Sequence, residues 1–208
     1  MRRGLMLLAG MVVLMPLTLA AQEIHPKAEV FGGYSYLRTN VTDVNAPPLS
    51  NGFFPAQDYN LHGWNTSVSA NLTSWLGLVG DFSGHYDLSE AARNDLIVGT
   101  NYHSFLFGPR FTSRSGRFNP FVHALFGAAR GSYDYDAPFG DITNTKFAMA
   151  LGGGVDVGIS DSFAVRLIQA DYMMTRFGAN NSGIGFDDDN GARQNNLRLG
   201  AGIIFRIR

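Results

Sequence analysis

Hydrophobic and polar residues alternate along several stretches of the chain, with the period of two that is typical of β-strands with one apolar face. The alternation is clearest in residues 61–73, 75–87, 146–157 and 195–207. In the last stretch one face comprises Leu197, Leu199, Ala201, Ile203, Phe205 and Ile207, and the other Asn196, Arg198, Gly200 and Gly202. We therefore predict strands that separate an apolar from a polar environment.

The same pattern predicts eight strands in all: 27–38, 61–73, 75–87, 101–112, 118–130, 146–157, 162–175 and 195–207. The connections between them alternate in length. Four are long (39–60, 88–100, 131–145 and 176–194), and three are short turns around 73–75, 113–117 and 158–161. Short turns on one side and long loops on the other are typical of outer-membrane barrels. The predicted fold class is all-β, an eight-stranded antiparallel up-and-down transmembrane β-barrel.

The apolar faces are predicted to meet lipid and the polar faces to line the interior, because a soluble barrel would place its apolar faces inside. Two strands depart from this pattern. In 118–130, Phe121 and Leu125 fall on the inner face. In 162–175 the alternation slips between Arg166 and Asp171, so both can point inward only if a β-bulge lies near Ile168–Gln169.

Composition agrees with a lipid-facing sheet. Charged residues make up 16% of the chain, where about 25% is usual, and glycine is well above its usual share of about 7%. Aromatic residues make up 12%. Those near predicted strand ends suit the two aromatic girdles of a membrane barrel: Tyr34, Tyr36, Trp64, Trp75, Tyr86, Phe118, Phe163 and Tyr172.

The first residues predict export. Arg2 and Arg3 precede an apolar run from Leu5 to Leu19, and the small residues Ala20 and Ala21 follow. This is the plan of a signal peptide, here residues 1–21, with cleavage after Ala20 or Ala21 left open. Residues 22–208 would then form one outer-membrane β-barrel domain, exported by the general secretory route.

Charge and cysteine content exclude several classes of protein. Removing Arg2 and Arg3 leaves 14 basic residues against 17 acidic ones, a net charge of −3 that gives no electrostatic footprint for nucleic acid. The chain has no cysteine, so neither a disulfide framework nor a lipid-accepting thiol is expected.

Several runs resemble a known family: Val30-Phe-Gly-Gly-Tyr-Ser-Tyr36, Phe105-Leu-Phe-Gly-Pro-Arg110, Asn119-Pro-Phe-Val-His123, Phe163-Ala-Val-Arg-Leu-Ile-Gln-Ala-Asp-Tyr172 and Asn196-Leu-Arg-Leu-Gly-Ala-Gly-Ile-Ile-Phe205. Together they resemble the OmpA/OmpX-type outer-membrane β-barrel domain. The resemblance implies a bacterial outer-membrane location, contact with outer-membrane lipids and lipopolysaccharide, and insertion by the barrel-assembly machinery. Gly202, Phe205 and Ile207 resemble the family's C-terminal assembly signal, although Arg208 stands where an aromatic residue is commonest.

The interior of an eight-stranded barrel has room for little more than side chains. The predicted polar lumen cluster comprises Asp81, His85, Arg110, Lys146, Asp156, Arg166, Asp171 and Arg198, with Glu29 as a further candidate. Similar distances from their turns predict two ion pairs, Asp156 with Arg166 and Asp171 with Arg198. We favour a structural plug over a conducting path.

No catalytic, cofactor or metal site is predicted. Ser83, His85 and Asp87 share a face with Asp81, but that face points inward, away from any lipid substrate. A lipid A-modifying hydrolase is therefore the least favoured reading. His25, His62 and His123 lack zinc spacing, and Asp187–Asn190 lacks the spacing of a calcium loop.

The predicted role is structural or surface interaction by a monomer, with a narrow porin-like channel for small solutes as the alternative. The long connections carry an excess of acidic residues: Asp43, Asp58, Glu90, Asp95, Asp134, Asp136, Asp141 and Asp187 to Asp189, against Arg93, Arg176 and Arg193. Solvated loops explain this excess most simply. The alternative is an acidic rim that gathers divalent cations or basic partners. The sequence does not identify the extracellular ligand.

Overall fold

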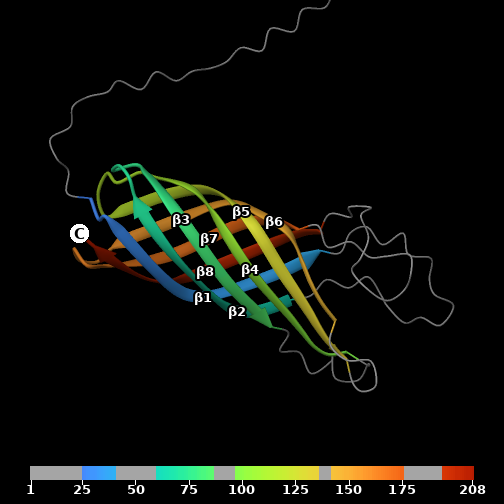
Figure 1. Ribbon diagram of the computed structural model, residues 1–208. Coiled ribbons are helices and arrows are strands. Elements are labelled where there is room, and N and C mark those ends of the chain that lie inside the picture. Colours follow the sequence, from blue (N-terminus) through green and yellow to red (C-terminus); the bar gives the residue numbers. More distant parts are fainter. Residues whose placement is uncertain (1–24, 41–59, 87–96, 136–141, 176–193) are drawn as a thin grey trace, which may run out of the picture.

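The computed structural model describes residues 25–40, 60–86, 97–135, 142–175 and 194–208, and within them eight strands close into a barrel (Figure 1). Neighbours in sequence are neighbours in the sheet, and every pair is antiparallel. The strands are β1 (Ala28–Asn40), β2 (Asn60–Asn71), β3 (Leu76–Tyr86), β4 (Ile97–Thr112), β5 (Phe118–Tyr135), β6 (Ile142–Gly158), β7 (Phe163–Thr175) and β8 (Gln194–Ile207). The predicted fold class is confirmed.

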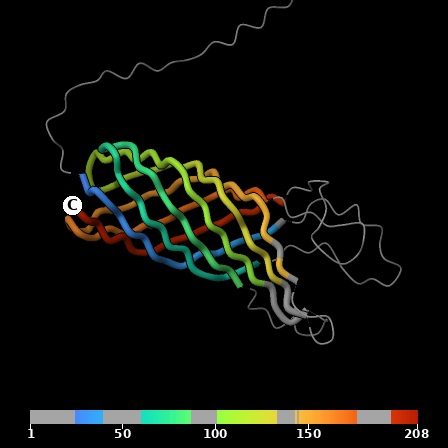
Figure 2. The backbone as a smooth tube through the Cα atoms, in the orientation of Figure 1, coloured from blue at the N-terminus to red at the C-terminus, as the bar shows by residue number. Residues whose placement is uncertain are grey.

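Pairing of β1 with β8 closes the sheet, in a register that runs from Ala28 opposite Ile207 to Asn40 opposite Asn195. Closure removes the free edges, so the backbone N–H and C=O groups can find partners without water. Figure 2 shows the strands tilted around the barrel axis, with the short turns and the C-terminus at one end. Among the described residues, no helix has the length and apolar character needed to span a bilayer.

Three strands are longer than the alternation predicts. β4 begins at Ile97, β5 continues to Tyr135 and β6 begins at Ile142. The β5–β6 ladder continues as far as Tyr133 opposite Ile142. The predicted long connection at 131–145 was therefore too long, because ladder pairing continues past the residues whose alternation marks the lipid-facing band.

Large apolar side chains point outward around the barrel, as predicted, with exposures such as 64% for Phe118 and 62% for Ile203. Aromatic residues gather near both ends of this band. At the short-turn end Trp75 stacks on Phe111, with ring centroids 5.9 Å apart, and Phe163 meets Phe205 edge-on at 5.3 Å. The predicted girdle residues of the other end also point outward: Tyr34, Tyr36, Trp64, Tyr86 and Tyr172.

The interior is less uniformly polar than the alternation predicts. One buried apolar cluster lies mostly toward the strand ends that meet the long connections; we call it the outer apolar cluster, and it comprises Leu37, Leu61, Val79, Tyr102, Leu106, Leu125, Ala129, Ala148, Ala150 and Met173. A smaller one joins Phe31, Ala164 and Ile204. The inward position of Leu125 is therefore part of a packed layer.

The predicted bulge in β7 is confirmed. Asp156 pairs with Arg166 and Val155 pairs with Ile168, so Leu167 is an extra residue between them. Leu167 and Ile168 are adjacent, yet both point outward, with 55% and 52% exposure. Arg166 and Gln169 consequently both face the interior, which a regular strand would not allow.

Candidate functional site

Charged and amide side chains from every strand fill the centre of the barrel and hydrogen-bond to one another. We call them the interior network. Each is at most 6% exposed: Glu29 on β1, Asn65 on β2, Asp81 on β3, Arg110 on β4, His123 on β5, Asp156 on β6, Arg166, Gln169 and Asp171 on β7, and Arg198 on β8. Because charges taken out of water are costly unless paired, the network is stable only if its partners are complete.

Asp156 is the central carboxylate of the half nearer the short turns. It accepts from Arg166 Nε at 2.8 Å and from Arg166 Nη2 at 3.1 Å. Arg110 Nη2 donates both to Asp156 at 3.0 Å and to Glu29 at 3.1 Å. The predicted contact between Asp156 and Arg166 is thus present, and Arg110 joins it to β1 across the barrel.

Arg198 is the central cation of the other half. It donates to Asp171 from Nε at 2.8 Å and from Nη2 at 2.7 Å, the second predicted pair. Its Nη1 donates to Asp81 at 2.7 Å, which Asn65 Nδ2 also reaches at 3.0 Å. His123 Nε2 donates to Asp171 at 2.8 Å. One guanidinium therefore links carboxylates on β3 and β7.

Gln169 connects the two halves. Its side-chain oxygen accepts from Arg166 Nη1 at 2.6 Å, and its nitrogen donates to Asp171 at 2.7 Å. The β7 bulge makes this link, since it turns Gln169 to the same side as Arg166. The interior network is therefore continuous from Glu29 at the short-turn end to Asp81.

Two phenyl rings and two guanidiniums stack alternately beside the ion pairs. Arg166 Cζ lies 4.3 Å from the ring centroid of Phe31 and 4.4 Å from that of Phe121, and Arg110 Cζ lies 4.6 Å from Phe121 on the same network. Such cation–π contacts strengthen when water is excluded. This explains why an aromatic residue occupies the inner face of β5, where the alternation predicts a polar one.

Inward glycines leave the space that the long side chains fill. A Cβ added at Gly152 would lie 2.0 Å from Asp171 Oδ1, and one at Gly154 would lie 2.9 Å from the ring of Phe121. Large and small residues thus face each other across neighbouring strands, as close packing requires.

The structure buries seven of the eight predicted lumen residues, but Lys146 is an exception. Lys146 is half-buried on β6 and does not join the interior network; its neighbours along the inner face, Ala148 and Ala150, belong to the outer apolar cluster. Lys146 therefore lies on the inner face, as the alternation predicts, at a level of β6 where its inward neighbours are apolar.

Sequence reasoning did not assign His123, Gln169 and Asn65 to the cluster. All three lie on the inner face of their strands. The alternation, which puts every second residue on that face, is the sequence signal that could have found them. Their partners come from other strands, and period-two alternation identifies a face without identifying what lies opposite.

No serine–histidine–carboxylate arrangement is present among the described residues at the predicted position. Ser83 Oγ shares a hydrogen bond with Ser104 Oγ at 2.7 Å, and His85 Nε2 shares one with Ser35 Oγ at 2.8 Å. His85 Nδ1 is buried with no partner in the described part of the barrel, so no carboxylate orients its ring there. Asp87 lies outside the described residues.

The structure also bears on the candidate metal ligands and on the acidic tract of the last long connection. Within the described ranges, no three histidine or carboxylate side chains are grouped so that they could hold a metal ion. The acidic tract at Asp187–Asn190 and the predicted signal peptide lie outside the described residues.

The geometry of a closed eight-stranded barrel, with an apolar exterior and charges inside, agrees with comparison to known families. The family model of the outer membrane protein beta-barrel domain matches residues 6–205. The chain belongs to the outer membrane protein beta-barrel domain family. This outer-membrane β-barrel protein accordingly resides in the bacterial outer membrane.

Solved structures of outer-membrane barrels share its fold. Neisserial surface protein A superimposes with a TM-score of 0.61 at 11% identity, covering 87% of this chain and 97% of that protein. Ail, the attachment invasion locus protein of Yersinia pestis, gives 0.52 at 19% identity, covering 88% and 100%. Among curated proteins, none matches this sequence. At these sequence identities the structural likeness establishes only the fold of this outer-membrane β-barrel protein.

The Arg198→Ala variant should be much less stable than the parent. Asp81 and Asp171 would remain buried without their shared cation, and breaking a buried pair in this way costs about 3–5 kcal/mol. Urea unfolding in detergent micelles, followed by tryptophan fluorescence, measures the loss. The matched control is Arg208→Ala, whose pair with Asp161 is exposed and should contribute about 0–1 kcal/mol. Equal midpoints for Arg198→Ala and the parent would contradict the assigned role of Arg198.

Gly152→Ala should also destabilise the barrel, by about 1–3 kcal/mol, because overpacking at this site displaces Asp171 from Arg198. Gly32→Ala is the control, since a Cβ there meets nothing within 4 Å. The same unfolding measurement compares the two substitutions. If both variants unfold together with the parent, Gly152 does not provide the space that Asp171 needs.

Proposed function

We propose that this outer-membrane β-barrel protein is a non-enzymatic scaffold whose long connections contact partners at the cell surface. In this proposal the interior is a fixed closure that stabilises the scaffold. The observation that carries it is the interior network, which draws a buried side chain from every strand into one hydrogen-bonded chain.

A path for solutes would have to cross two kinds of barrier. Each guanidinium of the interior network donates at least two hydrogen bonds to carboxylates, and those of Arg110 and Arg166 also stack on phenyl rings, so these groups do not move aside cheaply. The outer apolar cluster lies beyond it, with Leu37, Leu106, Leu125 and Met173 each 0% exposed. Both features support a closed barrel over a narrow porin-like channel, the alternative role.

The surface role rests on what the long connections contain. They carry ten carboxylates against three arginines in sequence, so at the cell surface they would attract cations and repel anions. Ail, a barrel of the same fold, has been crystallised with the heparin analogue sucrose octasulfate, a polyanion. The acidic connections of this chain would repel such a polyanion, which supports a different class of ligand, either divalent cations or a basic protein surface.

Shortening the connections should abolish this binding. A variant in which residues 41–59 and 176–193 are replaced by short Asn-Gly turns should lose affinity for calcium ions and for an oligolysine peptide, measured by calorimetry in detergent. The matched control keeps the full length and converts Asp187, Asp188 and Asp189 to Asn. Both variants should bind less than the parent, since charge rather than length attracts the ligand. Unchanged binding in both variants would rule out the acidic rim.

The closed interior predicts negligible conductance. In planar bilayers the refolded protein should show no discrete current steps, whereas a larger porin under the same conditions should show them. The variant with shortened connections should be equally silent, because the interior network and not the connections closes the barrel. Steps in the parent would favour the channel, and steps in the shortened variant alone would show that the connections block an open lumen.

A further inference from the structure

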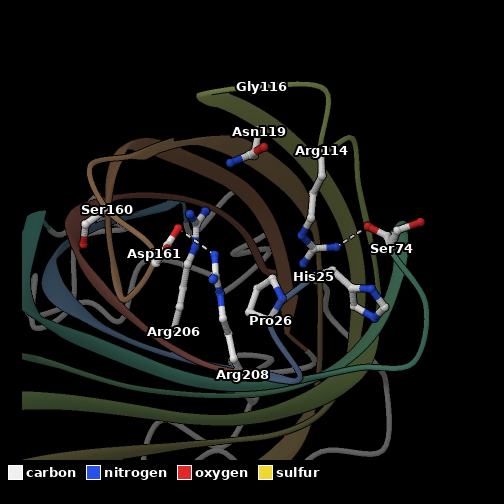
Figure 3. Close-up of a pocket in the computed structure, with 10 residues that line it drawn as sticks. All are labelled: His25, Pro26, Ser74, Arg114, Gly116, Asn119, Ser160, Asp161, Arg206 and Arg208. Atoms are coloured by element: carbon white, nitrogen blue, oxygen red, sulfur yellow. Dashed lines mark hydrogen bonds and ion pairs between the residues drawn. The ribbon is translucent and has the colours of Figure 1, made fainter. Parts of the chain in front are cut away.

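A hollow of about 270 Å³ opens at the short-turn end of the barrel, apart from the interior network's centre. It lies among the 113–117 turn, the 159–162 turn, the end of β8 and the residues before β1. Figure 3 shows Arg206 and Arg208 on one side of it and Arg114 with His25 on the other. Its lining is polar: His25, Pro26, Ser74, Arg114, Gly116, Asn119, Ser160, Asp161, Arg206 and Arg208.

Positive charge at this end exceeds the negative charge that faces it. Glu29, a buried residue of β1, is shared by Arg110 at 3.1 Å and by two arginines of the lining, Arg114 at 3.3 Å and Arg206 at 3.2 Å. Arg110 has one further carboxylate, Asp156, which it shares with Arg166. Two carboxylates therefore meet four guanidiniums, an excess of two positive charges.

The excess is partly withdrawn from water. The side chains of Arg114 and Arg206 are only 11% and 12% exposed. Cations in such surroundings are stabilised by an opposite charge. The pair between Arg208 and Asp161 is neutral and exposed, so it does not offset the excess.

The guanidiniums are held in place before any ligand arrives. Arg114 donates to the backbone oxygen of Ser74 as well as to Glu29. Asn119, with its amide oriented to satisfy both of its groups, accepts from Arg206 Nη2 at 3.1 Å and donates to the backbone oxygen of Gly116 at 3.2 Å. Little conformational freedom remains to be lost on binding, which favours affinity.

We propose that this hollow binds a phosphate group. A phosphate dianion matches the excess of two positive charges, and guanidinium forks bind phosphate through paired N–H donors. The hydroxyls of Ser74 and Ser160 lie on the same lining and add donors. The volume is much larger than the roughly 30 Å³ of one water molecule in the liquid, so the group can carry a substituent.

The location defines two sources of the phosphate. Short turns of outer-membrane barrels face the periplasm, so the hollow meets either phospholipid headgroups of the inner leaflet or soluble phosphate compounds. Both sources present phosphate oxygens to the arginines, a headgroup diester with one negative charge and a soluble phosphate or monoester with up to two. This site is independent of the proposed surface role, because it lies at the opposite end of the barrel from the long connections.

Nuclear magnetic resonance on the full protein in an uncharged, phosphate-free maltoside detergent tests the proposal. One arm titrates sodium phosphate against sodium chloride of equal ionic strength, and the other adds phosphatidylglycerol to the micelles. Saturable shifts of the Gly116 and Gly158 amides and of the arginine Nε–H groups are expected. Saturation by phosphate indicates a soluble ligand, and saturation by phosphatidylglycerol alone indicates a headgroup. If the shifts saturate in neither arm, the proposal is overturned.

Three substitutions show whether binding occurs in the hollow. Arg114→Gln should weaken it at least tenfold, and Arg117→Gln, an exposed arginine of the same turn outside the lining, should leave it unchanged. Asp161→Asn should tighten it severalfold, because Asp161 is the one carboxylate among the described lining residues and its side chain is 78% exposed. A misfolded protein cannot produce this gain. Equal losses in Arg114→Gln and Arg117→Gln would show that only net charge matters. No gain in Asp161→Asn would show that the anion does not bind beside Asp161. Either result would overturn the site.

Discussion

Each buried charge in this barrel has to find an opposite charge within the barrel itself, because lipid surrounds the sheet and the interior is packed with side chains. Arg198 meets Asp81, a residue 117 positions away in sequence, and Arg110 meets Glu29 across 81 positions. These contacts exist only when β1 and β8 have paired. Closure of the sheet and neutralisation of the interior therefore depend on each other.

Packing and electrostatics use the same residues. Phe121 lies between the guanidiniums of Arg110 and Arg166, so one ring both fills volume and stabilises two cations. Gly152 and Gly154 leave room for Asp171 and for that ring. A long side chain on one strand thus requires a glycine on the neighbouring strand. The high glycine content therefore reflects interior packing as well as turns.

Charge is distributed unevenly along the barrel axis. Arginines exceed carboxylates at the short-turn end, two carboxylates share the guanidinium of Arg198 in the other half, and the outer apolar cluster lies toward the long connections. In sequence, the long connections carry more acidic than basic residues, so the sign of the charge changes from the short-turn end to the long connections. Each end of the scaffold consequently presents a different chemistry, which supports separate roles for the hollow and for the surface connections.

The sequence by itself determined the number of strands, the face on which each residue lies, the bulge in β7 and the two ion pairs between neighbouring strands. These features are local: the period of two sets the face, and hairpin distance sets which residues of adjacent strands meet. Only the tertiary structure decided that Arg198 also reaches Asp81, that Phe121 stacks on two guanidiniums, that Lys146 stays outside the interior network and that three arginines surround one hollow. Contacts across a lumen depend on strand tilt and on the reach of each side chain, and alternation along one strand contains neither.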